Sequence, residues 1–167
     1  MIQYVILGFV VAILLLFAAR KILNRAPRYR RTVQDDLTKF FETLFERGYD
    51  RGFLVIEAPR ERFIQFSKYI KKKGELGLRF DFPLAPWSEK YYETLKKILY
   101  ERGIDYEIRS TGQDNVAAFI TIDFKKDFTK AMDLAKLVLV EVFLLQPTDK
   151  LKLYFDHINP RDERVGF

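Results

Sequence analysis

Few residues in this chain are of the types that usually carry acid-base or nucleophilic chemistry. His157 is the only histidine among 167 residues, and there is no cysteine. His157 follows Asp156 in the segment YFDHINP, where a regular strand would point the two side chains to opposite faces. A general base must lie within hydrogen-bonding reach of the group that it activates. We therefore expect a surface histidine at this position and not a catalytic one.

The hydroxyl and carboxyl side chains form no catalytic pattern either. Ser67, Ser88 and Ser110 lie outside any GxSxG context, and Ser88 has the position of a helix cap. Asp35 and Asp36 could bind a divalent ion, but the sequence places them in the first turn of a helix, where negative charge is favourable in any case. No GxxxxGK(S/T) or GxGxxG segment offers a phosphate cradle. The sequence predicts a protein that is not an enzyme and has no cofactor or metal site; an enzyme of unfamiliar design is the least favoured hypothesis.

One helical segment is a candidate protein interface. The stretch KLVLVEVFLLQ, residues 136–146, has Glu141 as the only charge between Leu137 and Leu145, so a helix here is apolar nearly all round. Such a helix must be covered on more than one side. The cover is either the sheet and the other helices or a second subunit or partner. In the second case the residues predicted to face the partner are Leu139, Val142 and Phe143.

A lysine cluster at the tip between two predicted strands is a candidate lipid contact. Near a membrane each lysine could add about 1 kcal/mol of attraction to anionic lipid. Lysines at a strand tip also keep a hairpin soluble and block edge pairing, which is the commoner reason for them. The cluster comprises Lys68, Lys71, Lys72 and Lys73.

The amino-terminal residues have the character of a transmembrane helix. The stretch IQYVILGFVVAILLLFAA, residues 2–19, contains no charge. As a helix it would be about 27 Å long, close to the hydrocarbon thickness of a bilayer. A cleaved signal peptide is the alternative, but its basic residues would precede the apolar run, and here they follow it. We expect an uncleaved transmembrane helix over residues 1–24.

A collar of positive charge follows the predicted span. Lys and Arg beside a span mark its cytoplasmic side, so the amino terminus would lie outside and the carboxyl-terminal domain in the cytoplasm, with the inner membrane as the location. Pro27 would end the helix, and residues 25–31 are predicted to be a basic juxtamembrane tether. Recognition of a specific anionic lipid is the other interpretation of the collar. Its basic residues are Arg20, Lys21, Arg25, Arg28, Arg30 and Arg31.

The distribution of charge argues against nucleic acid as a partner. The formal net charge is +6, but the collar accounts for all of it and leaves 23 Lys and Arg against 23 Asp and Glu in residues 32–167. A nucleic-acid-binding domain keeps a basic excess on its folded body, because neutralising phosphates provides much of its affinity. We therefore expect no nucleic-acid partner.

Hydrophobic periodicity predicts one α+β domain over residues 32–158, followed by a polar tail over 159–167. The expected order is α-β-β-β-α-β-β-α-β, with the helices on one face of a mostly antiparallel sheet. The helices are expected from Thr32 to Gly48, from Ser88 to Gly103 and from Asp127 to Leu145. The strands are expected at residues 53–58, 62–70, 76–82, 104–110, 116–124 and 151–158.

This order of elements resembles that of type III secretion chaperones and of the chaperone-like TY-Chap domains. The phrase FLVIEAPRERFIQFSKY, residues 53–69, is similar to the first hairpin of the latter. The resemblance covers residues 33–146 and rests on element order, without a diagnostic motif. It implies a non-enzymatic, protein-binding and often dimeric fold, with no catalytic residue to carry over. The chain departs from secretion chaperones in its neutral domain, predicted anchor and extra strand, which argues against a role in secretion itself.

These patterns together predict a single-pass, membrane-anchored protein with a cytoplasmic, chaperone-like, protein-binding domain. We expect it to be an accessory or assembly subunit of a membrane complex, with a protein partner or a self-dimer. The alternative is a membrane-tethered sensory domain that binds a small molecule in an aromatic-lined pocket between sheet and helices. The sequence identifies neither the partner nor a ligand.

Overall fold

The computed structural model describes residues 28–71, 74–111 and 117–158. The predicted transmembrane helix, the first three residues of the predicted tether and the polar tail lie outside these ranges. Within them, no helix combines the length and the apolar character that crossing a bilayer requires.

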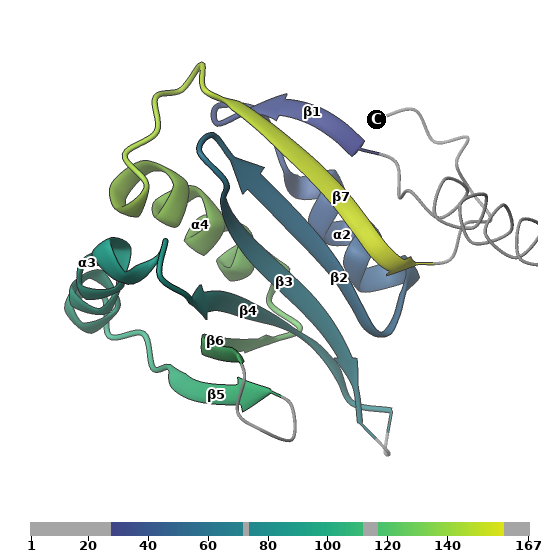
Figure 1. Cartoon of the computed structure of the whole chain (residues 1–167). Helices are drawn as coiled ribbons and strands as arrows, with labels where there is room; N and C mark the ends of the chain where they lie inside the picture. The colour runs from purple at the N-terminus through teal and green to yellow at the C-terminus, as the bar shows by residue number, and fades with distance from the viewer. Residues whose placement is uncertain (1–27, 72–73, 112–116, 159–167) are drawn as a thin grey trace, which may run out of the picture.

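The described residues form an α+β fold with one seven-stranded antiparallel sheet and three α-helices (Figure 1). The third helix continues into a short π-helical turn, η1. The strands are β1 (Arg28–Thr32), β2 (Gly48–Ala58), β3 (Arg62–Ile70), β4 (Leu76–Leu84), β5 (Glu107–Thr111), β6 (Ala117–Lys125) and β7 (Lys150–Ile158). The helices are α2 (Thr38–Arg47), α3 (Glu89–Glu101), α4 (Phe128–Leu137) and η1 (Val138–Val142).

The order of strands across the sheet is β1-β7-β2-β3-β4-β6-β5, and every neighbouring pair is antiparallel. Strands β2, β3 and β4 form the predicted meander, and β5 and β6 form the predicted hairpin. The last strand, β7, lies between β1 and β2, so the two ends of the described chain are neighbours in the sheet (Figure 1).

Strand β1 corrects the prediction that residues 25–31 form a tether. Arg28 to Thr32 pair in register with Tyr154 to Lys150 of β7 and form an edge of the sheet. Tyr29 packs edge-on against Phe40 of α2 and Phe155 of β7, at centroid distances of 5.4 and 6.2 Å. The sequence pattern did not indicate this strand, because an edge strand with one aromatic residue among three arginines has little apolar signal of its own.

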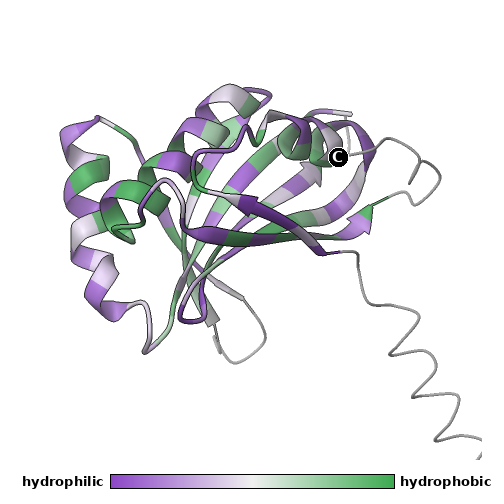
Figure 2. Cartoon of the chain, turned by 90° about the horizontal axis from the view of Figure 1, so that it is seen from above, coloured by the Kyte–Doolittle hydropathy of each residue, from purple (hydrophilic) through white to green (hydrophobic). Residues whose placement is uncertain are grey.

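The helices cover one face of the sheet, where the core lies, as the view in Figure 2 shows. Alternate residues of the inner strands point into this core, as the twofold period of a strand requires. On β3, for example, Ile64 and Phe66 are fully buried, whereas Gln65 and Ser67 point to the opposite face and are half-buried. No helix packs on that opposite face within the described ranges, and it is turned toward the viewer in Figure 1.

The first helix begins later than predicted, at Thr38 and not just after Thr32. The Asp35 carboxylate accepts a hydrogen bond from the backbone N–H of Thr32 at 2.6 Å, which is one of the two bonds of the predicted capping box. The Thr32 hydroxyl has no partner among the described residues, and the chain forms a turn here instead of a helix. Asp36 accepts from both the N–H and the hydroxyl of Thr38. These bonds lower the pKa of Asp36, the Thr38 hydroxyl first. The paired aspartates therefore shape the approach to α2 and do not lie within its first turn.

Ser88 stands at the N-cap position of α3, but its hydroxyl does not bond to the helix. It donates to the carbonyl of Pro83 at 2.6 Å and accepts from the N–H of Ala85 at 2.9 Å. Asp127, by contrast, caps α4 in the expected way by accepting from the N–H of Lys130. Ser88 thus fixes the turn that leads from β4 into α3.

Candidate functional site

The three residues predicted to face a protein partner are part of the core. Leu139, Val142 and Phe143 are 0%, 2% and 2% exposed. The ring of Phe143 packs between those of Phe82 and Tyr91 at centroid distances of 6.1 and 5.0 Å. The core-facing side of the nearly all-apolar helix is therefore covered by its own domain, while Val140 and Leu144 remain exposed. In this conformation the three side chains are not available to a partner.

The structure places the lysines of the predicted cluster in different environments. Lys68 is only 5% exposed, and its ammonium group donates to the carbonyl of Phe45 near the end of α2. It points into the helix-covered face, so it is not a surface contact for lipid. Lys71 is exposed and pairs with Glu75 at 3.1 Å. Lys72 and Lys73 lie outside the described residues.

His157 lies close to Asp156, contrary to the expectation of opposite faces. The distance from His157 Nδ1 to Asp156 Oδ1 is 3.3 Å, and both side chains are largely exposed. The reason is a backbone φ of +53° at His157, which breaks the alternation of a regular strand. No group of three or more residues suited to a metal ion occurs in the described parts of the chain. The pair is a contact between two exposed side chains.

Exposed apolar side chains gather where α3 ends and β5 begins. Tyr100 is 86% exposed, Ile108 55% and Tyr106 37%. Strand β5 is paired on one side only, by β6, and α3 makes its main helix contact with η1 instead of covering β5. The core-side face of the sheet is therefore left partly open at this edge. We call this region the α3–β5 surface.

A groove of about 410 Å³ extends the α3–β5 surface between the loop after α3 and helix α4. Its floor is apolar and its rim carries both signs of charge. The apolar lining residues are Ile104, Ile122, Phe124, Leu134 and Leu137, and the charged ones are Arg102, Asp105, Asp123, Lys130 and Asp133. On the other side of the same loop, a hollow of about 670 Å³ is lined by Tyr100, Ile104 and Tyr106, among others. An apolar floor with a polar rim is the usual anatomy of a protein interface.

The uncovered face of the sheet holds a separate polar pocket of about 390 Å³. We call it the arginine pocket and define it by Ser67, Arg79, Asp81, Arg109 and Thr121. The residues come from four strands that the strand order places side by side. Asp81 lies in the middle, where its carboxylate accepts from the hydroxyls of Ser67 at 2.7 Å and Thr121 at 3.0 Å. Burial raises the pKa of Asp81, while these two hydrogen bonds and the nearby arginines work in the opposite direction.

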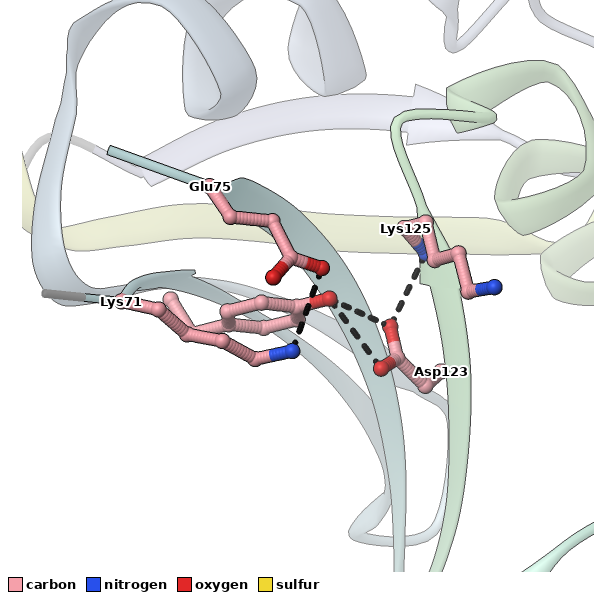
Figure 3. Close-up of polar contacts among 5 residues, drawn as sticks. Lys71, Glu75, Asp123 and Lys125 are labelled. Carbon is pink, nitrogen blue, oxygen red and sulfur yellow. Dashed lines mark hydrogen bonds and ion pairs between the residues drawn. The ribbon is translucent and has the colours of Figure 1, made fainter. Parts of the chain in front are cut away.

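A hydrogen-bonded group around Asp123 supports one wall of the arginine pocket (Figure 3). The Tyr69 hydroxyl donates to both carboxylate oxygens of Asp123, at 2.9 and 3.1 Å, and the N–H of Lys125 donates to Oδ1 at 2.9 Å. The Lys71–Glu75 ion pair lies alongside. Burial and the bond to Asp123 raise the pKa of Tyr69 from 10.0 to about 12. The ring of Tyr69 is thereby held in place as a platform.

Neither the α3–β5 surface nor the arginine pocket was predicted from the sequence. The signals for the pocket were present in β3 and β4, where Gln65, Ser67, Arg79 and Asp81 alternate with buried apolar residues. They are typical of any solvated sheet face, so they did not distinguish a pocket. The structure defines an α+β domain with one helix-covered face and one open face. No family model, curated protein or solved structure matches the chain, so the resemblance to secretion chaperones and TY-Chap domains stays a prediction.

Proposed function

We propose that this protein is a non-catalytic, protein-binding domain held at a membrane by its amino-terminal segment, and that it binds its partner on the α3–β5 surface. The observation that carries the proposal is Ile108, which is 55% exposed on the edge strand β5. A groove with apolar lining residues lies between the loop that leads to β5 and helix α4. Exposed apolar patches with polar rims mark interaction sites in soluble domains. The order of the elements supports the chaperone-like class, with β1 as an addition.

The partner that suits this surface best is an extended segment of another protein. The outer edge of β5 carries backbone donors and acceptors that a further strand could pair with. Ile108 lies opposite Ile120 of β6, on the core side of the sheet. Alternate apolar residues of an added strand would then lie beside Ile108. The rim has both signs of charge, so a segment without strong net charge fits.

The strand order supports a role for the anchor. Strand β1 contains the last three residues of the basic collar and forms one edge of the sheet, and β5 forms the opposite edge. Six strand spacings separate them, or about 29 Å. A membrane segment attached at the β1 edge would leave the β5 edge free, and tethering would raise the effective concentration for a membrane partner into roughly the millimolar range. We infer an accessory or assembly subunit of a membrane complex on the cytoplasmic side.

Site-specific photo-crosslinking in native membranes tests the docking surface. A photoreactive amino acid at Ile108 or Tyr100 should give a discrete adduct of higher mass. The matched controls are Tyr49, which is 54% exposed on β2, and Val140, which is 46% exposed on η1. Adducts at the control positions in equal yield, or none at Ile108 and Tyr100, would contradict the proposal. An adduct of twice the chain mass identifies a self-dimer through β5.

The membrane part of the proposal has its own test. Protease added to intact cells should leave residues 28–158 uncut, whereas protease added after the inner membrane is opened should digest them. The mature chain should also retain its first twenty residues in a mass spectrum. Digestion in intact cells, or a mature amino terminus near residue 20, would show that the anchor and its orientation are wrong while leaving the docking surface to be judged separately.

The sensory alternative has less support from the packing. The aromatic rings between sheet and helices lie against one another, with centroid distances of 4.7 Å for Phe41 and Phe66 and 5.3 Å for Phe66 and Phe80. All three rings are at most 1% exposed. The faces of these rings are already in contact with one another in the core. This favours a protein partner over a ligand bound between sheet and helices.

A further inference from the structure

The arginine pocket lies on the open face of the sheet, and its lining is separate from that of the α3–β5 groove. A solvated sheet face needs no concave site, yet here five side chains from β3, β4, β5 and β6 surround a hollow of about 390 Å³. That volume is at the small end of the range for ligand pockets. The contacts in the pocket indicate what kind of ligand would fit.

Arg79 is held in a fixed position but has unused donors. Its guanidinium carbon lies 4.3 Å from the centre of the Tyr69 ring, and the Tyr69 hydroxyl is bonded to Asp123. Stacking satisfies the face of the guanidinium but none of its N–H groups. The Nε atom is buried without a hydrogen-bond partner, and no ion pair forms between Arg79 and a carboxylate of the described residues. A buried donor without an acceptor is costly, and a bound oxyanion that reached this edge of the guanidinium would remove that cost.

A second arginine adds to the positive charge of the pocket. Arg109 of β5 contacts the carboxylate of Glu107 through Nε, and its side chain is 43% exposed. Arg51 lies at the rim and is 92% exposed. Lys68 also borders the pocket, but its ammonium group is bound to Phe45 on the other face. Asp81 is the one acidic residue of the lining, so the lining has an excess of positive charge.

The hydroxyl groups at the base are also arranged for binding. Ser67 and Thr121 both donate to Asp81, which leaves their oxygen lone pairs as acceptors. Gln65, directly opposite Asp81 in the register, adds an amide. Ser67 and Gln65 can contact the hydroxyl or amide groups of an organic ligand, whereas Thr121 is only 1% exposed and holds Asp81 from below. A carboxylate or phosphate requires the guanidinium groups.

We propose that the arginine pocket binds a small ligand through a carboxylate or phosphate group, which Arg79 and Arg109 hold while Ser67 and Gln65 contact the rest of the molecule. The planar fork of arginine matches both groups and forms the stronger, charge-assisted class of hydrogen bond. Because Tyr69 already fixes Arg79, little side-chain entropy is lost on binding. The lining of this pocket and that of the α3–β5 groove have no residue in common.

Titration calorimetry on the full-length protein in detergent tests the pocket with inorganic phosphate and with malonate, a dicarboxylate. Chloride at equal ionic strength is the reference. At least one probe should bind saturably. Arg79→Gln should weaken that binding about tenfold or more, Arg109→Gln should weaken it less, and Arg79→Lys should be intermediate because the charge stays and the fork is lost. Arg60→Gln, in the exposed turn after β2, is the matched control and should change nothing.

Asp81→Asn gives a test in the opposite direction. The amide oxygen can still accept a hydrogen bond, but the negative charge beside the ligand is gone. Binding should tighten by about threefold or more. A merely structural role of this cluster predicts no such gain. The inference is overturned if neither probe binds, if Arg79→Gln and Arg60→Gln bind equally well, or if Asp81→Asn weakens binding as much as Arg79→Gln does.

The source of the oxyanion is distinguished by a second set of measurements. The protein is sedimented with vesicles of phosphatidylcholine that either contain or lack phosphatidic acid. The result is compared with the binding of phosphate and malonate. Arg79-dependent sedimentation with phosphatidic acid indicates a lipid headgroup. Arg79-dependent binding of phosphate or malonate, with equal sedimentation of Arg79→Gln and the unaltered chain, indicates a soluble ligand.

Discussion

At the residue scale, two buried cations of β3, Lys68 and Arg62, bond to the ends of helical segments that pack on the sheet. Lys68 donates to the carbonyl of Phe45 in the last turn of α2, and Arg62 donates to the carbonyl of Phe143 at the end of η1, at 2.6 Å. Cations at the carbonyl ends of helices are favourable, because the unpaired carbonyls and the helix dipole are negative there. Burial lowers the pKa of Lys68. Both residues are therefore structural, although lysines and arginines are usually read as surface charge.

Tyr69 gives a prediction for alkaline pH. Its pKa is about 12 in the folded protein against 10.0 ordinarily, so below pH 10 it is protonated in both states and contributes fully to stability. As the pH rises from 10 through 12, the unfolded chain loses the proton first, and the free energy of unfolding falls. Tyrosine absorbance should show one late step near pH 12 in the full chain.

The variant Tyr69→Phe provides the control for this late titration. It should lose the late absorbance step, and its free energy of unfolding should fall less steeply between pH 10 and 12. An unchanged absorbance curve in the variant would show that another tyrosine is responsible, with Tyr154 as the next candidate because burial raises its pKa too.

At the scale of elements, the end of the third helix is the most irregular part of the fold. Helix α4 widens into η1, where the N–H of Phe143 bonds to the carbonyl of Val138 at 2.8 Å, and the N–H of Leu145 reaches the carbonyl of Leu139. Leu144 then takes a left-handed backbone with φ +55°, and its side chain is 74% exposed. The widened turn lets Val142 and Phe143 both face the core before the chain turns toward β7.

Leu144→Gly should stabilise the protein. A left-handed conformation costs a residue with a Cβ atom about 1 kcal/mol or more, and glycine avoids that cost at a helix end. We expect a gain of about 1 kcal/mol in the free energy of unfolding, measured by denaturant titration. Leu144→Ala keeps the Cβ atom and should give no gain, since the leucine side chain is mostly in solvent. Equal values for the two variants would mean that the backbone at this position is not strained.

At the scale of the whole molecule, the two ends of the domain depend on each other. Strand β7 is paired on one side with β1 and on the other with β2, so the strand that carries the last residues of the basic collar protects the last strand from solvent. The anchor is thus predicted to attach directly to a structural edge of the sheet. A force or a movement at the membrane would act on β1 before any other element.

Truncation tests this dependence. A chain that begins at residue 33 lacks β1 and the contacts of Tyr29 with Phe40 and Phe155, whereas a chain that begins at residue 28 retains them. We expect the shorter chain to lose about 2 kcal/mol or more of its free energy of unfolding. Its open β7 edge should also promote self-association, seen as a larger species in light scattering. Equal stability and size of the two chains would show that β1 contributes nothing to the fold.

Local pattern was sufficient to predict most elements of this protein from its sequence. The strand at residues 62–70 was predicted at its observed bounds, because Ile64 and Phe66 alternate with polar residues between clear turn signals. The cap at Asp127 was also predictable, since it acts within three residues. The start of α2 was not, because the bond from the Thr32 N–H to Asp35 also closes a turn, and no helix follows until Thr38. Strand β1 was not either, because it obtains its apolar cover from β7, more than a hundred residues away.

The sequence by itself determined the α+β class, the meander and the hairpin, since each follows from the periodicity of neighbouring residues. Only the tertiary structure decided that β7 lies between β1 and β2, that Leu139 and Val142 are core, and that Arg79, Asp81, Arg109 and Thr121 share one pocket. The physical reason is that periodicity tells which face of an element is apolar, whereas the partner of that face depends on packing between distant segments. A functional surface is what such packing leaves uncovered, so it becomes visible only when the whole sheet is assembled.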